Sequence, residues 1–196
     1  ALGKPPVEAI RTIFWDPLFG DFAGYFRPQL LVKAAPLILI AIGLSFGFRA
    51  GIWNIGAEGQ YIMGALFGAG FALAFYPSEA RWLIFPLMIV AGTLGGLLWA
   101  MIPGILRVRF KTNEILVSLM LVYVADFLLD AMALGLLRNP EGMGFPGSRN
   151  LQQYPAAHNA ELIANTGMHW GVIAALFAVV AAYILLSRHI FGFNVR

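Results

Sequence analysis

The residues best suited to handling a polar molecule lie in a glycine-punctuated stretch, 48–60, between two long apolar runs. Asn54 and Glu58 are four residues apart and share one face if the stretch is helical, and Gln60 follows them. Amide and carboxylate groups can hold a polar solute, and Trp53 can stack on a ring-shaped one. The alternative is a cytoplasmic turn in which Asn54 caps the next helix and Glu58 lies in its first turn. The residues alone leave both interpretations open.

A second group of polar side chains lies inside a later apolar run. Tyr123, Asp126 and Asp130 are spaced i, i+3 and i+7, so they project from one stripe of a helix. A carboxylate inside a span is costly and is expected to face the bundle interior or an aqueous path. Interhelical hydrogen bonds that fix packing are the structural alternative. Paired carboxylates also serve general acid–base catalysis, but no serine, histidine or metal-ligand partner is arranged around these two. We therefore predict no catalytic residue.

Other kinds of chemistry have little support. The chain has no cysteine, which excludes thiol nucleophiles and thiolate metal sites, and its three histidines lack metal-ligand spacing. No glycine-rich loop ending in lysine and serine or threonine is present, so we expect nucleotide hydrolysis elsewhere. We predict no metal and no cofactor in this chain.

The composition is that of an integral membrane protein. Of the 196 residues, 60% are hydrophobic and 12% are charged, about half the charge of a globular chain. A net charge of +3 would point to nucleic acid in a soluble protein; here cytoplasmic loops explain it better. We predict an all-α, polytopic transmembrane helical bundle in a lipid bilayer, with a broken or re-entrant polar segment near 49–59. Its five spans are expected at 30–48, 60–76, 82–102, 114–137 and 170–186.

The distribution of lysine and arginine predicts the orientation of the spans. Arg107, Arg109 and Lys111 lie in one connection, and Arg188 and Arg196 follow the fifth span. Short cytoplasmic loops carry such an excess of positive charge, so both regions are predicted to be cytoplasmic. The first four of these spans make up 30–137. The N-terminal tail (1–29, with a possible interfacial helix) and the loop 138–169 are then external, and 170–196 holds the fifth span and the start of a cytoplasmic segment.

Small residues predict close helix packing. Gly64, Gly68 and Ala72 repeat at four-residue spacing in the second predicted span, and a similar group recurs in the third. That second group consists of Ala91, Gly92, Gly95 and Gly96. Before the fourth span, Thr112 or Asn113 is expected to cap the helix, with Glu114 near its positive end.

The stretch Phe48 to Gly64 (FRAGIWNIGAEGQYIMG) resembles the permease subunit of a bacterial ABC importer, in the branched-chain amino acid/simple sugar permease superfamily. The most similar branch is that for nucleosides and related simple sugars. One departure is Val122, where that branch often has asparagine before the tyrosine. The resemblance extends over nearly the whole chain, including 33–37, 109–120, 142–146 and 191–196.

The resemblance implies a set of partners and an internal fragment. A first span would precede Ala1, and 193–196 would lead into the helix that docks on an ATPase, so 1–196 would be a partial transmembrane permease domain. The expected partners are a second permease subunit, a cytoplasmic ATPase that holds ATP and Mg, and an external solute-binding protein. No nucleic acid is expected. The expected location is the bacterial inner membrane, as a multi-pass protein.

The function implied is translocation of a nucleoside or simple sugar by alternating access, without enzyme activity in this chain. The path or gate would involve Trp53, Asn54, Glu58, Gln60, Tyr123 and Asp126. The cytoplasmic partner would face Arg107, Arg109, Lys111 and Arg196. An ion-coupled carrier or channel, for which carboxylates within spans are usual, is the alternative. A polytopic membrane enzyme would need a further base or metal ligands that the sequence lacks.

Overall fold

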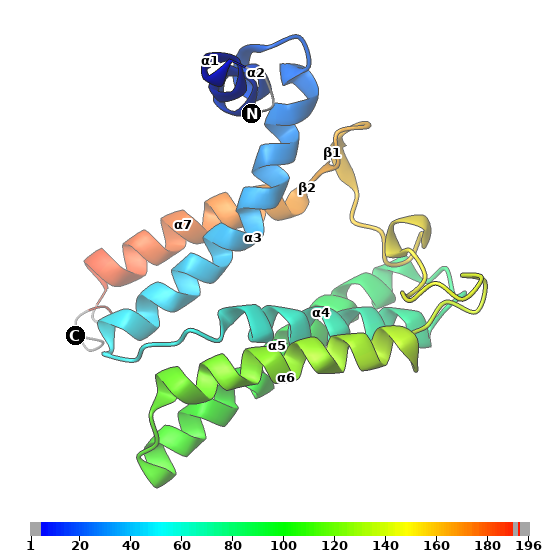
Figure 1. The fold of residues 1–196 in the computed structure, drawn as a ribbon. Coiled ribbons are helices and arrows are strands. Elements are labelled where there is room, and N and C mark those ends of the chain that lie inside the picture. The colour runs from blue at the N-terminus through cyan, green and yellow to red at the C-terminus, as the bar shows by residue number, and fades with distance from the viewer. Residues whose placement is uncertain (1–4, 190–191, 193–196) are drawn as a thin grey trace. The chain divides into compact units, whose positions relative to one another are not determined.

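The chain folds almost entirely into helices (Figure 1). The structure, a computed structural model, describes residues 5–189 and Gly192. Its internal contacts divide it into two compact units, one formed by Ala1–Ser45 with Ala160–Arg196 and the other by Phe46–Asn159. The predicted all-α class is confirmed, with one two-stranded sheet as the exception within the described residues.

The first unit joins the beginning of the chain to its last helix. Three short helical segments precede the long helix α3, whose final residues belong to the second unit. They are α1 (Pro6–Ile10), the π-helical turn η1 (Arg11–Trp15) and α2 (Asp16–Phe19), followed by α3 (Ala23–Arg49). The antiparallel strands β1 (Glu161–Ile163) and β2 (Met168–His169) then lead into α7 (Trp170–Arg188).

Small side chains and one amide hold this unit together. Ala35 of α3 is buried against Val172 and Ala175 of α7. The Gln29 side chain donates a hydrogen bond from Nε2 to the backbone oxygen of Thr166 at 2.7 Å. Among the described residues, contact between α3 and α7 is therefore confined to this small apolar cluster, and Gln29 adds a polar contact from α3 to the strand turn.

The second unit is a three-helix layer with a loop folded over one end. Helix α4 packs against both α5 and α6. The elements are α4 (Ala57–Ala74), α5 (Arg81–Phe110), α6 (Glu114–Leu134) and the short 3-10 helix η2 (Leu151–Gln153) in the loop.

Four of the described helices, α3, α5, α6 and α7, are long and apolar enough to cross a membrane. They correspond to four of the five predicted spans. The fifth, α4, has 18 residues, but its first turn carries Glu58 and Gln60, and it is not one of the four. Its apolar part, from Ile62 onward, still lies between α5 and α6, which agrees with a polytopic bundle of about five helices.

Two helices run further than the sequence pattern predicts. Helix α3 begins at Ala23, seven residues before the expected start, so the N-terminal tail is shorter than 1–29. Helix α5 continues through Pro103 to Phe110, and the connection predicted at 103–113 shrinks accordingly. It stops where Lys111 adopts a left-handed conformation, φ +54°. A proline inside a helix removes one backbone hydrogen bond and crowds the preceding turn, yet Pro103 is buried within α5, so tertiary packing outweighs that local cost.

The N-terminal segment predicted to be interfacial is helical. Side chains of Ile10, Ile13, Phe14, Trp15 and Phe19 are all exposed. An exposed apolar row beside charged residues suits the boundary of a bilayer. Its membrane location remains a prediction.

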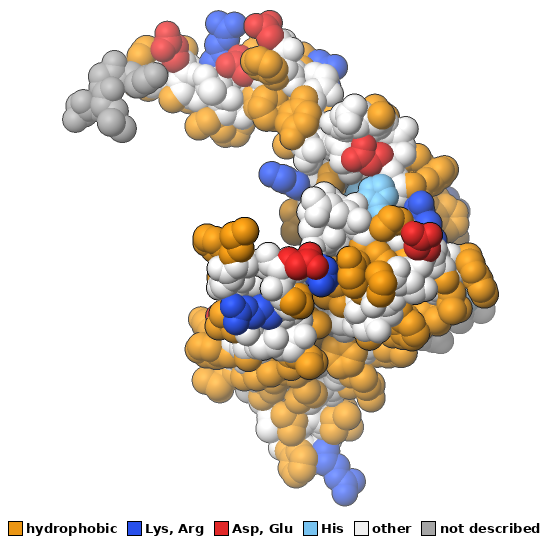
Figure 2. Space-filling view, turned by 90° about the vertical axis from the view of Figure 1, so that its right-hand side faces the viewer, with side chains coloured by type: hydrophobic (Ala, Val, Ile, Leu, Met, Phe, Trp, Pro, Cys, Tyr) orange, Lys and Arg blue, Asp and Glu red, His pale blue; other side chains and the backbone are white. Residues whose placement is uncertain are grey.

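The molecular surface is apolar, as expected for a chain surrounded by lipid and by other membrane helices. Figure 2 shows hydrophobic side chains over most of the visible face, with charges confined to a few places. Phe127 of α6 is 74% exposed, and Phe177 of α7 is equally so. No hydrophobic effect opposes exposure of such side chains in a lipid environment, so packing within the bundle depends on close fit instead.

That close fit is made by glycine between α4 and α5, which confirms the predicted small-residue face. A Cβ atom on Gly64 would lie 3.1 Å from the backbone oxygen of Gly92, and one on Gly96 would lie 3.1 Å from that of Gln60. At Gly95 the atom would lie 2.6 Å from Cβ of Phe67. A methyl group at Gly64 or Gly96 would therefore crowd the facing backbone, and one at Gly95 would overlap the side chain of Phe67.

The loop after α6 is anchored by Tyr154, which is 3% exposed. Its hydroxyl donates toward the backbone oxygens of Phe75 and Ser78, at 3.1 and 2.7 Å, and its ring packs against that of Tyr76. Burial, with a smaller contribution from Tyr76, raises the pKa of the Tyr154 hydroxyl above its ordinary value of 10. The neutral donor thus ties the loop to the end of α4.

We expect Gly95→Ala to destabilise the complete permease by about 1–3 kcal/mol, because the added methyl group overlaps Phe67. The matched control is Gly104→Ala in the same helix, where a Cβ meets nothing within 4 Å. Thermal unfolding in detergent measures both. Equal destabilisation by the two substitutions would contradict close packing at Gly95.

We expect Tyr154→Phe to lower the free energy of unfolding by about 1 kcal/mol, the usual net value of a hydrogen bond. Because the folded-state pKa is raised, this stabilisation is complete below the unfolded value of about 10 and is lost as pH rises through the folded value. Unfolding midpoints between pH 8 and 11 should therefore fall more steeply in the parent than in Tyr154→Phe. The exposed Tyr183→Phe serves as control, and identical pH profiles for parent and Tyr154→Phe would refute the assignment.

Candidate functional site

The polar segment predicted near 49–59 is a break between two helices. Helix α3 ends at Arg49, a turn follows at Gly51 with φ +70°, and regular structure resumes at Ala57. The backbone N–H of Ile52 donates back to Gly47 at 2.9 Å, and the rings of Phe48 and Trp53 lie 5.2 Å apart. The chain therefore leaves one helix and enters the next through irregular backbone, whose polar groups need partners.

Two of the predicted site residues meet at the start of α4. The Asn54 side chain accepts a hydrogen bond from the N–H of Gly56 at 2.9 Å, and donates from Nδ2 to Oε1 of Gln60 at 3.1 Å. Asn54 thus satisfies a backbone donor just before α4, in a local turn. The N-cap of α4 is Gly56, without a side-chain cap bond, so the helix cap expected of Asn54 is not formed. Glu58 is exposed on the first turn, and within the described residues its carboxylate makes no hydrogen bond or ion pair.

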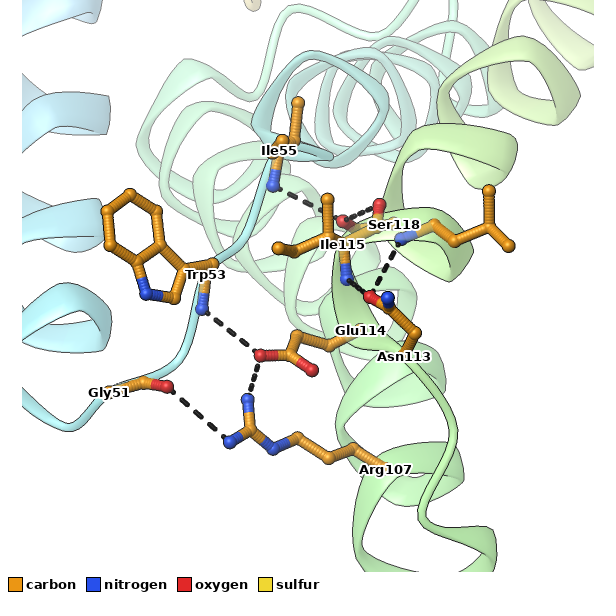
Figure 3. Close-up of polar contacts among 9 residues, drawn as sticks. Gly51, Trp53, Ile55, Arg107, Asn113, Glu114, Ile115 and Ser118 are labelled. Carbon is orange, nitrogen blue, oxygen red and sulfur yellow. Dashed lines mark hydrogen bonds and ion pairs between the residues drawn. The ribbon is translucent and has the colours of Figure 1, made fainter.

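A charged pair that joins α5 to α6 makes hydrogen bonds to the backbone of the break (Figure 3). Arg107 forms an ion pair with Glu114, through Nη1 and Oε1. The same carboxylate oxygen accepts from the backbone N–H of Trp53 at 3.5 Å, and Nη2 of Arg107 donates to the backbone oxygen of Gly51 at 3.4 Å. One ion pair therefore serves a donor and an acceptor of the irregular segment.

A buried serine holds the next part of the segment. Ser118 on α6 is 2% exposed; its hydroxyl accepts from the N–H of Ile55 at 3.2 Å and donates to the oxygen of Ile115 at 3.1 Å (Figure 3). A Cβ atom at Gly56 would lie 2.7 Å from the backbone oxygen of Ser118. Glycine is thus required where the break crosses α6.

The start of α6 is fixed by Asn113, which confirms the predicted helix start. Its side-chain oxygen accepts from the N–H groups of Ile115 and Leu116, at 3.0 and 3.4 Å. With this cap in place Glu114 projects toward the break from the first turn, where a negative charge also favours the helix dipole.

The break also closes over a buried polar atom that has no partner. The indole Nε1 of Trp99 on α5 is buried without a hydrogen bond, and so is Oγ1 of Thr112. A Cβ atom on Gly59 would lie 3.3 Å from that indole nitrogen. An unsatisfied donor beside the first turn of α4 costs stability unless a water or a ligand reaches it.

The remaining predicted path residues lie elsewhere on α6. Tyr123 is 60% exposed and Asp126 is also exposed, whereas the buried face of α6 carries Val122 and Ala125. No hydrogen bond or ion pair in the described residues links Tyr123 or Asp126 to the break. Their role in a path remains a prediction, as does that of Trp53, 57% exposed.

The predicted cytoplasmic cations differ in their surroundings. Arg107 is engaged with Glu114, whereas Arg109 and Lys111 are exposed at the end of α5. Arg196 lies outside the described residues. A partner-facing role for all four remains a prediction. Among the described residues no cluster of three His, Cys, Asp or Glu side chains could hold a metal ion.

Sequence reasoning missed that Glu114 and Ser118 hold the break. The local sequence predicts Glu114 only as a charge in the first turn of a helix, and Ser118 lies within an apolar run. The available signal was their spacing: i and i+4 at the start of a span place both on one face of the helix.

Comparison with known proteins identifies a family. The model of the branched-chain amino acid transport system / permease component family matches residues 27–196. A glucose ABC transporter permease of Haloferax volcanii is 34% identical over the whole chain and 52% of its own length. No solved structure matches the chain.

Two relatives with other printed names are similar over most of the chain. A guanosine ABC transporter permease of Bacillus subtilis is 28% identical over 94% of this chain and 52% of its own. A nucleoside ABC transporter permease of Lactococcus lactis is 29% identical over all of this chain and 54% of its own. The chain thus spans about half the length of the curated relatives it matches.

We expect Arg107→Gln or Glu114→Gln to loosen the break, because the N–H of Trp53 and the oxygen of Gly51 would each lose a charged partner. Hydrogen exchange at residues 52–56 in the complete permease should become faster by about tenfold or more, corresponding to a bond to a charged group of about 1.5–3 kcal/mol. Arg109→Gln, two residues away and exposed, is the control. A double substitution no worse than either single one would confirm coupling; unchanged exchange would contradict it.

Proposed function

We propose that this chain, which belongs to the family of branched-chain amino acid transport permease components, forms part of the membrane-spanning permease subunit of an ATP-driven importer. The described helices suit that place, because four can cross a membrane and α4 packs between two of them. The family consists of permeases rather than enzymes. ATP and Mg would be held by a separate cytoplasmic ATPase.

The observation that best supports a transport role is the pinned break between α3 and α4. Irregular backbone at membrane depth is tolerated where it is buried in protein or lines a water-filled cavity. Here Arg107, Glu114 and Ser118 satisfy part of its backbone, while Trp53 and Glu58 stay exposed. A short, interrupted helix of this kind is the usual sequence pointer to a translocation site.

The solute proposed is a nucleoside or a simple sugar, carried unchanged. The relatives that match over most of the chain are named for glucose, guanosine and nucleosides. Such solutes present hydroxyl groups and a ring, which suit the exposed Glu58 carboxylate and the indole of Trp53. Asn54 is already bonded to Gly56 and Gln60, so its contribution is to shape the site.

The mechanism proposed is alternating access in a complex with a second permease subunit. ATP binding on the ATPase would rock the two permease halves, and an external solute-binding protein would deliver the solute. The charged pair Arg107–Glu114 ties the end of α5 to the break. Movement of the cytoplasmic end of α5, next to the exposed Arg109 and Lys111, would therefore be passed on to Trp53 and α4.

The complete importer in proteoliposomes tests this function. Uptake of labelled guanosine and glucose should require ATP on the ATPase side and the binding protein on the other. It should survive collapse of the proton gradient and stop when the ATPase is inactivated. Uptake driven by the proton gradient alone would favour an ion-coupled carrier, and product formation without an ATPase would favour an enzyme.

We expect Glu58→Gln and Trp53→Ala each to reduce ATP-dependent uptake by about tenfold, the equivalent of one bond to a charged group or one ring contact of about 1.5 kcal/mol. The basal ATPase rate of the complex should stay unchanged, because neither side chain makes a hydrogen bond to another described residue. Glu79→Gln and Trp82→Ala, also exposed but beyond the other end of α4, are matched controls. Full uptake in both site variants would contradict the assignment of this site.

A further inference from the structure

The end of the second unit opposite the break contains a pocket that the transport site does not use. It has a volume of about 460 Å³ and lies where α4 and α6 end. By the lysine and arginine count this end faces outside. Its lining includes Gly70, Tyr76, Leu136, Leu137, Arg138 and Arg149.

The part of this pocket around Arg138 and Arg149, called here the upper part, is cationic. Arg149 stacks on the ring of Tyr76, 4.4 Å from its centre, and pairs with Glu141 at 3.2 Å. The guanidinium of Arg138 makes no hydrogen bond or ion pair with any described residue. Two guanidinium groups against one carboxylate leave an excess positive charge, and such groups bind phosphate in bidentate fashion.

An apolar cavity lies next to this pocket and is taken here as its lower part. This cavity, of about 150 Å³, shares Gly70, Leu136 and Leu137 with the first. It continues down the α4–α6 seam, between side chains of which none carries a hydrogen-bonding group. These are Met63, Leu66, Phe67, Leu128 and Met132.

The order of the two parts along α4 suits a lipid. The end of α4 at Ala74 lines the same pocket as Arg138 and Arg149, beside the loop that follows α6. The apolar cavity begins at Gly70, one turn further into the helix, and follows α4 and α6 away from that loop. A phosphate near the loop and an acyl chain between the helices would therefore occupy the two parts in the order that a bilayer requires.

We propose that this two-part pocket binds an anionic phospholipid, with its phosphate at Arg138 and Arg149 and one acyl chain along the α4–α6 seam. A sugar or nucleoside suits the upper part only, because the lower part offers its hydroxyl groups no partner. A covering protein segment would need to supply an anion to Arg138, whereas a lipid supplies it together with the chain that fills the seam. The proposal rests on membrane insertion and not on the identity of the transported solute.

The test uses the complete importer in nanodiscs, with native mass spectrometry to count the lipids that remain bound. Phosphatidylglycerol should be retained at least tenfold better than phosphatidylcholine. Arg138→Gln should remove that preference, whereas Arg81→Gln, an exposed arginine at the same membrane level on α5, should leave it unchanged. Equal retention of the two lipids by the parent would overturn the proposal.

A second variant tests the apolar part without altering charge. A Cβ on Gly70 would meet only the end of Leu137, at 3.8 Å, so Gly70→Leu can fold with its side chain in the pocket. It should expel the retained phosphatidylglycerol while the thermal stability of the lipid-free complex stays within a few degrees of the parent. Retention unchanged in both Gly70→Leu and Arg138→Gln would show that the retained lipid lies elsewhere, and would refute lipid binding in this pocket.

Discussion

The structure around the candidate site depends on one requirement: irregular backbone between two membrane helices must find hydrogen-bond partners. Side chains of α5 and α6 supply several of these partners. The ion pair of Arg107 with Glu114 meets much of the requirement, because it accepts from Trp53 and donates to Gly51. Because the two side chains come from α5 and α6, the break also fixes where these helices meet.

Glycine makes that arrangement possible, since the segment must come close to α6 before α4 can begin. Gly56 lies against the backbone of Ser118, and Gly59 lies against that of Val122. The same principle continues along α4, where Gly64 meets Gly92 of α5. Close backbone approach therefore supplies the packing that hydrophobic burial cannot supply in lipid.

Much of the fold could be predicted from periodicity and composition, because an apolar run of about 20 residues has few alternatives to a membrane helix. The break, the small-residue face and the Asn113 cap followed from local sequence in the same way. The continuation of α5 through Pro103 did not, because a local rule disfavours proline within a helix. The short α4 was close to the prediction, beginning three residues before the expected start and ending two residues before the expected end.

The sequence by itself determined the class of the protein, the position of the polar break and the residue types available there, since these depend on composition and on neighbours along the chain. Only the tertiary structure decided which side chains make hydrogen bonds to the break and which stay exposed beside it. The Asn54 side chain bonds to Gly56 and Gln60, whereas Glu58 is exposed. Glu114 and Ser118, each more than 50 residues further along the chain, bond to the backbone of the break. Such pairings depend on how α5 and α6 pack against α4, and no local pattern encodes that geometry.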